Sequence, residues 1–134
     1  MTSRATGTFD VKTSPLPLAA AEREGGMGRM LLEKQYHGDL DATSTGEMLT
    51  GMGDVPGSAG YVAIERVEGT LGGRRGGFLL QHSGIMDCNI PTLTVRVIPD
   101  SGTGELTGLT GTLTFRAEGK WHDYVIDYTV PSPG

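Results

Sequence analysis

The sequence predicts an all-β protein built from many short strands. Its 22 glycines in 134 residues are more than twice the usual share of about 7%, and they are dispersed rather than periodic. No stretch carries a sustained apolar stripe of helical period, whereas alternating segments rich in threonine and valine recur between turn-forming residues. Short strands joined by glycine-rich turns favour a β-sandwich or a β-barrel.

Eight candidate strands follow one another along the chain. Each is bounded by glycine, proline or short polar residues, which favour turns. The expected strands span residues 6–13, 28–38, 39–52, 61–71, 77–85, 92–99, 111–118 and 121–130. Residues 19–27 form the one helix-like fragment, or else a loop. Because no linker or shift in composition divides the chain, we expect one domain over residues 1–134, with a core at about 6–130.

Charge and composition exclude several classes of function. A net charge of −5 and a pI of about 5.1 argue against nucleic acid or an anionic membrane as the main partner. Cys88 is the only cysteine, so no disulfide forms within the chain, which suits a reducing compartment. The N-terminus lacks the apolar core of a signal peptide, and no run of about 18 apolar residues is present. We therefore expect a soluble, cytoplasmic protein.

The strand expected at 61–71 has apolar residues on both faces. Tyr61, Ala63 and Glu65 share one face, while Val62 and Ile64 share the other. A barrel has one interior, so this pattern suits a strand with the interior on one side and a subunit contact on the other. We expect a homo-oligomer, a dimer rather than a larger assembly.

Three ionisable residues fall on faces that are otherwise apolar, namely Lys34, Glu65 and His82. Burying a charge without a partner is costly, so these three are expected to interact. If the segments 61–71 and 77–85 form a hairpin, Glu65 and His82 lie roughly opposite each other, within hydrogen-bonding reach. The pair would then be an acid/base unit, with Lys34 holding a developing negative charge. The alternative is a buried polar network that only fixes the strand register.

Four further residues are expected to line the interior as a binding surface. Tyr36, Tyr61 and Phe78 are in phase with apolar neighbours on their strands, and Ser44 is assigned to the same surface. No cofactor and no metal are expected. The segment "YHGDLD" (36–41) holds metal-ligand residue types, but it crosses a tight turn without a second cluster, which indicates a solvated hairpin end.

Two other reactive-looking features favour structural readings. Cys88 lies beside Asp87, whose negative charge disfavours a catalytic thiolate. The segment "PDSGTGELTGLTGTLTFR" (99–116) contains four glycines, but a phosphate-binding loop opens a helix, and here a strand follows. This segment is therefore predicted to serve the barrel architecture at its rim.

Four segments together resemble the DUF3224 family of bacterial proteins of unknown function. They are "KQYHGDLDATSTGEM", "GSAGYVAIERVEGTL", "GFLLQHSG" and "PDSGTGELTGLTG", and the similarity covers roughly residues 6–130. This resemblance implies an eight-stranded antiparallel barrel of the allene oxide cyclase-like kind, usually oligomeric, whose interior can hold an apolar small molecule. It does not imply allene oxide cyclase activity, because barrel folds host many functions.

Taken together, the residues and the resemblance predict a barrel that binds a small apolar molecule. One interpretation is a cofactor-free cyclase, isomerase or lyase, in which shape, water exclusion and a few fixed polar groups supply the catalysis. The alternatives are a non-catalytic ligand-binding protein and a structural oligomer with a filled barrel. A cavity with convergent polar groups would favour the first two.

Overall fold

The structure is a computed structural model that describes residues 2–19, 25–118 and 121–131. It contains the eight predicted strands, which are β1 (Ser3–Pro15), β2 (Met27–Gly38), β3 (Leu40–Met52), β4 (Ala59–Leu71), β5 (Arg74–Asp87), β6 (Ile90–Val97), β7 (Thr110–Glu118) and β8 (Trp121–Thr129). Most of the fragment expected to be helix-like lies outside the described residues. Within them, no helix has the length and apolar character needed to cross a membrane.

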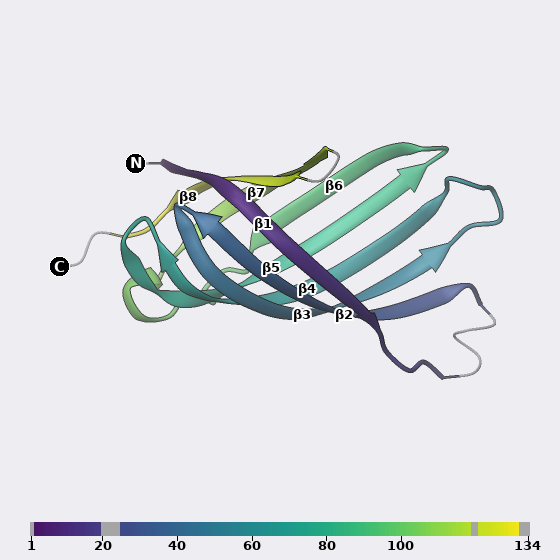
Figure 1. Cartoon of the computed structure of the whole chain (residues 1–134), viewed down its shortest axis with the longest axis horizontal. Helices are drawn as coiled ribbons and strands as arrows, with labels where there is room; N and C mark the ends of the chain where they lie inside the picture. The colour runs from purple at the N-terminus through teal and green to yellow at the C-terminus, as the bar shows by residue number, and fades with distance from the viewer. Residues whose placement is uncertain (1, 20–24, 119–120, 132–134) are drawn as a thin grey trace.

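The strands form a closed antiparallel barrel in which each strand pairs with its neighbours in sequence (Figure 1). The last strand, β8, pairs with β1, so that Thr6 lies opposite Val125, and this pairing closes the sheet. Every strand therefore has a partner on both sides, although β6 and β7 share only two residue pairs. The predicted all-β fold with eight antiparallel strands is confirmed.

The hairpins are tighter than the sequence indicated, and the strands are correspondingly longer. The turn between β4 and β5 is made by Gly72 and Gly73 alone, so both following arginines already belong to β5. Cys88 and Asn89 turn the chain with φ angles of 47° and 70°, so β5 and β6 extend through residues expected to be a connector. Positive φ at both central residues suits a two-residue hairpin.

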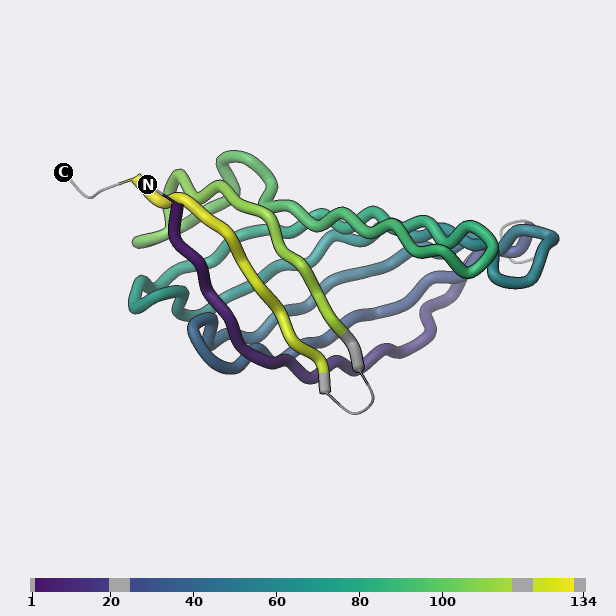
Figure 2. Tube along the Cα trace, turned by 90° about the horizontal axis from the view of Figure 1, so that it is seen from above, coloured from purple at the N-terminus to yellow at the C-terminus, as the bar shows by residue number. Residues whose placement is uncertain are grey.

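The long strands extend past one end of the barrel. In β6, only Val95 and Arg96 pair with β7, so the outer halves of β3 to β6 continue beyond β7 and β8. Figures 1 and 2 show these strands running well past the ends of β7 and β8. We call residues 48–52, 59–62, 83–87 and 90–94 the overhang. Its inner face is not covered by another strand in the described parts of the chain.

The other end of the barrel is closed by the glycine-rich segment. A short 3₁₀ turn, η1 (Gly104–Leu106), directs Leu106 and Leu109 into the core, where each is 1% exposed. The backbone of this segment packs directly against β5. A Cβ added at Gly76 would lie only 2.0 Å from the Thr103 carbonyl oxygen, so the close approach requires glycine there. The segment therefore serves the architecture, as predicted, and it seals one end of the interior.

The interior between the two ends is filled by large apolar and aromatic side chains. The Tyr124 hydroxyl accepts a hydrogen bond from the Leu40 amide at 2.8 Å and donates to the His37 carbonyl at 2.9 Å, which ties β8 to the turn between β2 and β3. The buried cluster consists of Ala5, Phe9, Tyr36, Leu40, Ala42, Val67, Leu71, Phe78, Leu80, Val95, Val97, Leu106, Leu109, Leu113, Tyr124 and Ile126.

Candidate functional site

Glu65 lies at the centre of the barrel wall and faces inward from β4. It is 0% exposed, and its neighbours across the sheet are Gly46 on β3 and Leu80 on β5. His82 also faces inward, but it lies opposite Ala63 rather than opposite Glu65. Glu65 and His82 are therefore roughly opposite and within hydrogen-bonding reach, as expected, but they are offset by two residues in the register. The two residues are diagonal neighbours, and their long side chains still meet.

The Glu65 carboxylate accepts hydrogen bonds from four side chains. One oxygen accepts from the Ser44 hydroxyl at 2.5 Å and from the Tyr36 hydroxyl. The other accepts from Lys34 Nζ at 3.1 Å and contacts His82 Nε2 at 2.8 Å. We call these five residues the Glu65 cluster. Because β2, β3, β4 and β5 each contribute to it, the cluster holds half of the barrel wall in one register.

The cluster keeps Glu65 ionised. Burial by itself raises the pKa of this carboxyl, but the hydrogen bond from His82, the charge of Lys34, and the Ser44 and Tyr36 hydroxyls outweigh that effect and lower the pKa to about 2. The pKa of Tyr36 is raised well above its usual value by burial and by the charge of Glu65. At neutral pH, Glu65 is therefore a fixed anion and Tyr36 a fixed hydroxyl donor. A carboxyl with such a pKa is a weak general base near pH 7.

Aromatic rings enclose the cationic side of the cluster. Lys34 Nζ lies 4.5 Å from the centre of the Phe115 ring and 5.3 Å from that of Phe9. The His82 ring stacks on Phe115 with 5.6 Å between centroids and 6° between planes. The Lys34 side chain is only 7% exposed. The ring faces attract the ammonium group electrostatically while they exclude water from it.

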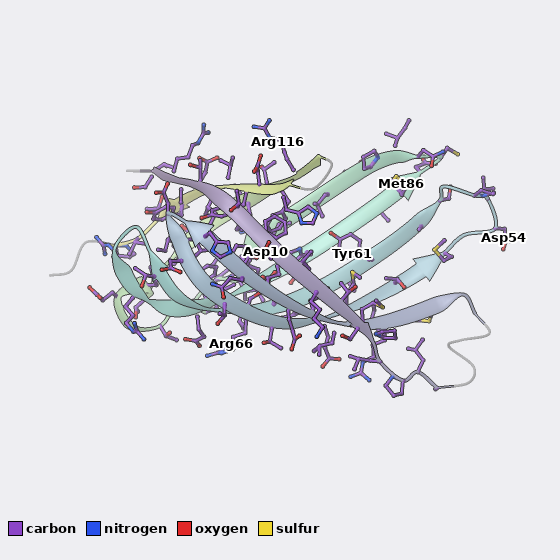
Figure 3. The ribbon with its side chains drawn as sticks, viewed as in Figure 1. Asp10, Asp54, Tyr61, Arg66, Met86 and Arg116 are labelled. Atoms are coloured by element: carbon purple, nitrogen blue, oxygen red, sulfur yellow. The ribbon has the colours of Figure 1, made fainter. Side chains whose placement is uncertain are left out.

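An apolar trough of about 520 Å³ lies on the inner face of the overhang. Its walls come from the ends of β3 and β6, and Ala59 and Gly84 form part of its floor. The lining residues are Met48, Thr50, Met52, Ala59, Gly60, Tyr61, Gly84, Ile85, Met86, Pro91, Thr92 and Leu93. Figure 3 shows Tyr61 and Met86 along the long strands, with Met86 towards their outer end.

Tyr61 joins the trough to the Glu65 cluster. Its ring rests on the backbone of Gly84, where an added Cβ would lie 2.3 Å from the ring. His82 is the next inward-facing residue of β5 after Gly84, towards the barrel centre. Burial first, and then the charge of Glu65, raise the pKa of Tyr61, so its hydroxyl stays protonated at neutral pH. The inner end of the trough therefore lies beside the neutral Tyr61 hydroxyl, and the charged side chains of the Glu65 cluster lie deeper in the barrel.

The predicted site residues divide into three groups. Lys34, Tyr36, Ser44, Glu65 and His82 form the cluster, whereas Tyr61 lines the trough. Phe78 lies elsewhere, because it packs in the core opposite Val67 and is 1% exposed. The functional roles of these residues remain predictions.

Sequence reasoning missed most of the trough. Met86 and Pro91 were expected in a connector, but they face each other across the β5–β6 hairpin. Met48 is in phase with Ser44 on β3, so the two side chains share the inner face of that strand. The turn at Cys88 and Asn89 has no glycine, so the continuation of the hairpin was not evident from the sequence.

The segment after Tyr36 is used in local contacts. His37 Nε2 lies 2.9 Å from an Asp10 carboxylate oxygen, and Asp39 accepts a hydrogen bond from the Thr6 amide at 2.9 Å. In the parts of the chain that the structure describes, no group of three or more His, Cys, Asp or Glu side chains is arranged to hold a metal ion.

Comparison with known proteins gives one family. The model of the family described as "Protein of unknown function (DUF3224)" matches residues 5–128. A crystal structure of a DUF3224 protein of unknown function from Shewanella oneidensis MR-1 is 47% identical, with a TM-score of 0.91 over 99% of this chain and 100% of that one. No curated protein shows significant similarity. The chain belongs to the DUF3224 family.

Proposed function

We propose that this protein binds a small apolar molecule in the trough of the overhang. The observation that carries the proposal is the trough itself, a cavity of about 520 Å³ with an almost entirely apolar lining. Pockets for small organic ligands fall in this size range and combine apolar walls with a few polar groups. Here the Thr50 and Tyr61 hydroxyls supply those polar groups.

The character of the walls indicates the kind of ligand. Met48, Met52 and Met86 line the trough together, and methionine side chains adapt to ligands of different outline. Neither of the polar side chains named above is charged at neutral pH, and the Glu65 carboxylate is saturated with donors within the cluster. The trough therefore suits an uncharged, largely hydrocarbon molecule with one hydrogen-bonding group at the Tyr61 end.

Adjacent residues of β6 provide a matched test. Leu93 faces the trough, whereas Thr94 lies on the outer face of the same strand and is exposed. Leu93→Asp puts a charge against the apolar ligand, while Thr94→Asp adds the same charge outside. With the neutral fluorescent probe N-phenyl-1-naphthylamine, we expect saturable binding that Leu93→Asp weakens at least about tenfold and Thr94→Asp leaves unchanged. The proposal fails if the wild-type protein does not bind the probe, or if both variants behave alike.

The His82–Glu65 contact supports a second candidate, cofactor-free isomerisation or elimination of the bound molecule. Glu65 orients the ring through Nε2, and no hydrogen bond of Nδ1 occurs within the described residues. Because Glu65 stays ionised, proton transfer falls to His82, with Glu65 as the group that orients it.

Native mass spectrometry of the purified protein separates the two candidates. Wild type and His82→Gln are expressed alike, and the molecules that each retains are compared. Retained molecules that differ between the two support catalysis, because the variant then holds a substrate that the wild type converts. The same molecule in both supports binding alone, and an empty trough in both counts against either function.

A further inference from the structure

The outer face of the same strands carries a second apolar surface, and we propose that it binds a second copy of this chain. The surface, here called the outer patch, consists of Leu49, Val62, Ile64 and Ile85. Their exposed fractions are 41%, 52%, 45% and 58%. Exposed apolar side chains that gather on one face of a protein mark a binding surface more often than chance scatter does.

The register of the sheet makes these four side chains neighbours. Leu49 lies directly opposite Val62 across β3 and β4. Val62 and Ile64 are successive outward residues of β4, and Ile85 on β5 is opposite Gly60. The patch therefore centres on β4, with β3 and β5 on its two sides.

The patch contains a hollow as well as protruding side chains. A depression of about 420 Å³ is bordered by Met27, Leu49, Val62 and Ile85. Its floor includes Gly51 and Gly60, which are paired across β3 and β4. In a two-fold symmetric dimer, the same surface of each copy forms the contact. That surface must therefore carry both the projecting side chains and the hollow that receives them. Val62 and Ile64 are the projections next to this hollow.

The charges around the patch favour a second copy over a charged partner. Arg29 pairs with Glu47 at 2.8 Å beside Leu49, and Arg66 pairs with Glu68 at 3.2 Å further along β4. Figure 3 shows Arg66 on the side of the barrel away from Arg116. The chain as a whole carries −5, but these flanking charges are neutralised in pairs. A neutral surface can meet its own copy without placing like charges together.

This inference does not rest on the proposed function. The trough is lined mainly by inward-facing residues of the overhang, and the outer patch by outward-facing residues of the same strands. Ile85 borders both, so the test variants are placed at other positions. A dimer through the outer patch leaves the trough open. Loss of the dimer and loss of probe binding are therefore separate results.

Gly51 gives a sharp test because its surroundings are empty. A Cβ added there meets no atom within 4 Å, so a longer side chain fills the hollow without disturbing the strand. We expect the wild type to have twice the 14.1 kDa mass of one chain by light scattering at tens of micromolar. Gly51→Arg and Ile64→Asp each place a charge in the contact, so the dissociation constant should rise at least about a hundredfold.

Two control variants distinguish loss of the contact from a general effect of substitution. Gly51→Ala should remain a dimer, and Thr114→Arg, on exposed β7, should remain a dimer as well. Circular dichroism and thermal unfolding show that each variant is folded. A monomeric or trimeric wild type overturns the inference, and so does a Gly51→Arg variant that still dimerises. Flotation of a wild-type monomer with phosphatidylcholine vesicles, lost in Gly51→Arg, would assign the patch to lipid and overturn it too.

Discussion

The two ends of the barrel use the same kinds of side chain in opposite ways. At the closed end, Leu106 and Leu109 are each 1% exposed, because a segment of the chain folds back over the opening. At the overhang, Met86 and Leu93 are 39% and 43% exposed on an inner face that no described strand covers. Burial stabilises the fold at the closed end. At the overhang, apolar side chains that remain this exposed contribute little to the stability of the fold, which agrees with the binding role proposed for them.

The Glu65 cluster lies between these two regions and belongs to neither. It is as buried as the closed end, yet it is built from charged and hydrogen-bonding groups. No side-chain nitrogen or oxygen among the described residues is both fully shielded from solvent and without a hydrogen-bond partner. A network this complete fixes one arrangement of β2 to β5, and it gives the inner end of the trough a rigid boundary.

The largest expected effect comes from breaking the cluster. Glu65→Leu leaves the Lys34 ammonium buried without its counter-charge, so we expect a loss of roughly 3–5 kcal/mol of unfolding free energy in urea titrations. The double variant Glu65→Leu/Lys34→Met removes both charges and should recover most of that loss. A double variant no more stable than the single one would show that the cluster's hydrogen bonds, rather than its charge balance, hold this region.

Acid should weaken the cluster before it affects the closed end. The pKa of Glu65 is about 2 in the folded chain, against an ordinary value of 4.5, so the folded state holds its proton more weakly than the unfolded state does. The resulting stability is fully present above pH 4.5 and is lost as the pH falls through 2, by about 3 kcal/mol in all.

The same double variant provides the control for the acid titration. Urea titrations of the wild type and of Glu65→Leu/Lys34→Met are compared from pH 6 to pH 2. We expect the wild type to lose about 3 kcal/mol more than the double variant over this range. Parallel curves for the two proteins would mean that other carboxylates account for the acid sensitivity.

The inner and outer faces were predictable from the sequence, whereas the register and strand lengths were not. Side chains alternate strictly along a strand, so the inward phase of Glu65 and His82 follows from their apolar neighbours. Their exact alignment depends on the length of the turn. A turn at Gly72 and Gly73 pairs Glu65 with Leu80 and not with His82.

The trough escaped prediction for a related reason. Its wall requires β5 and β6 to continue to Asp87 and from Ile90, across a turn of Cys88 and Asn89 in an uncommon backbone conformation. It also requires β7 to meet β6 only near Val95, and nothing in the local sequence specifies that partner. Local patterns determine which way a side chain points, but the trough depends on where distant strands end.

The smallest expected change in stability is also the one that separates the two ends most directly. Met86→Ala removes a side chain that is 39% exposed at the overhang, so the unfolding free energy should fall by less than about 1 kcal/mol. Leu106→Ala removes a side chain of similar size from the closed end, where the cost should be roughly 2–5 kcal/mol. For binding of N-phenyl-1-naphthylamine, we expect the reverse order, with affinity reduced several-fold in Met86→Ala and unchanged in folded Leu106→Ala. If Met86→Ala destabilises the protein as much as Leu106→Ala does and leaves probe binding intact, the overhang is part of the packed core, and its trough is not a binding site.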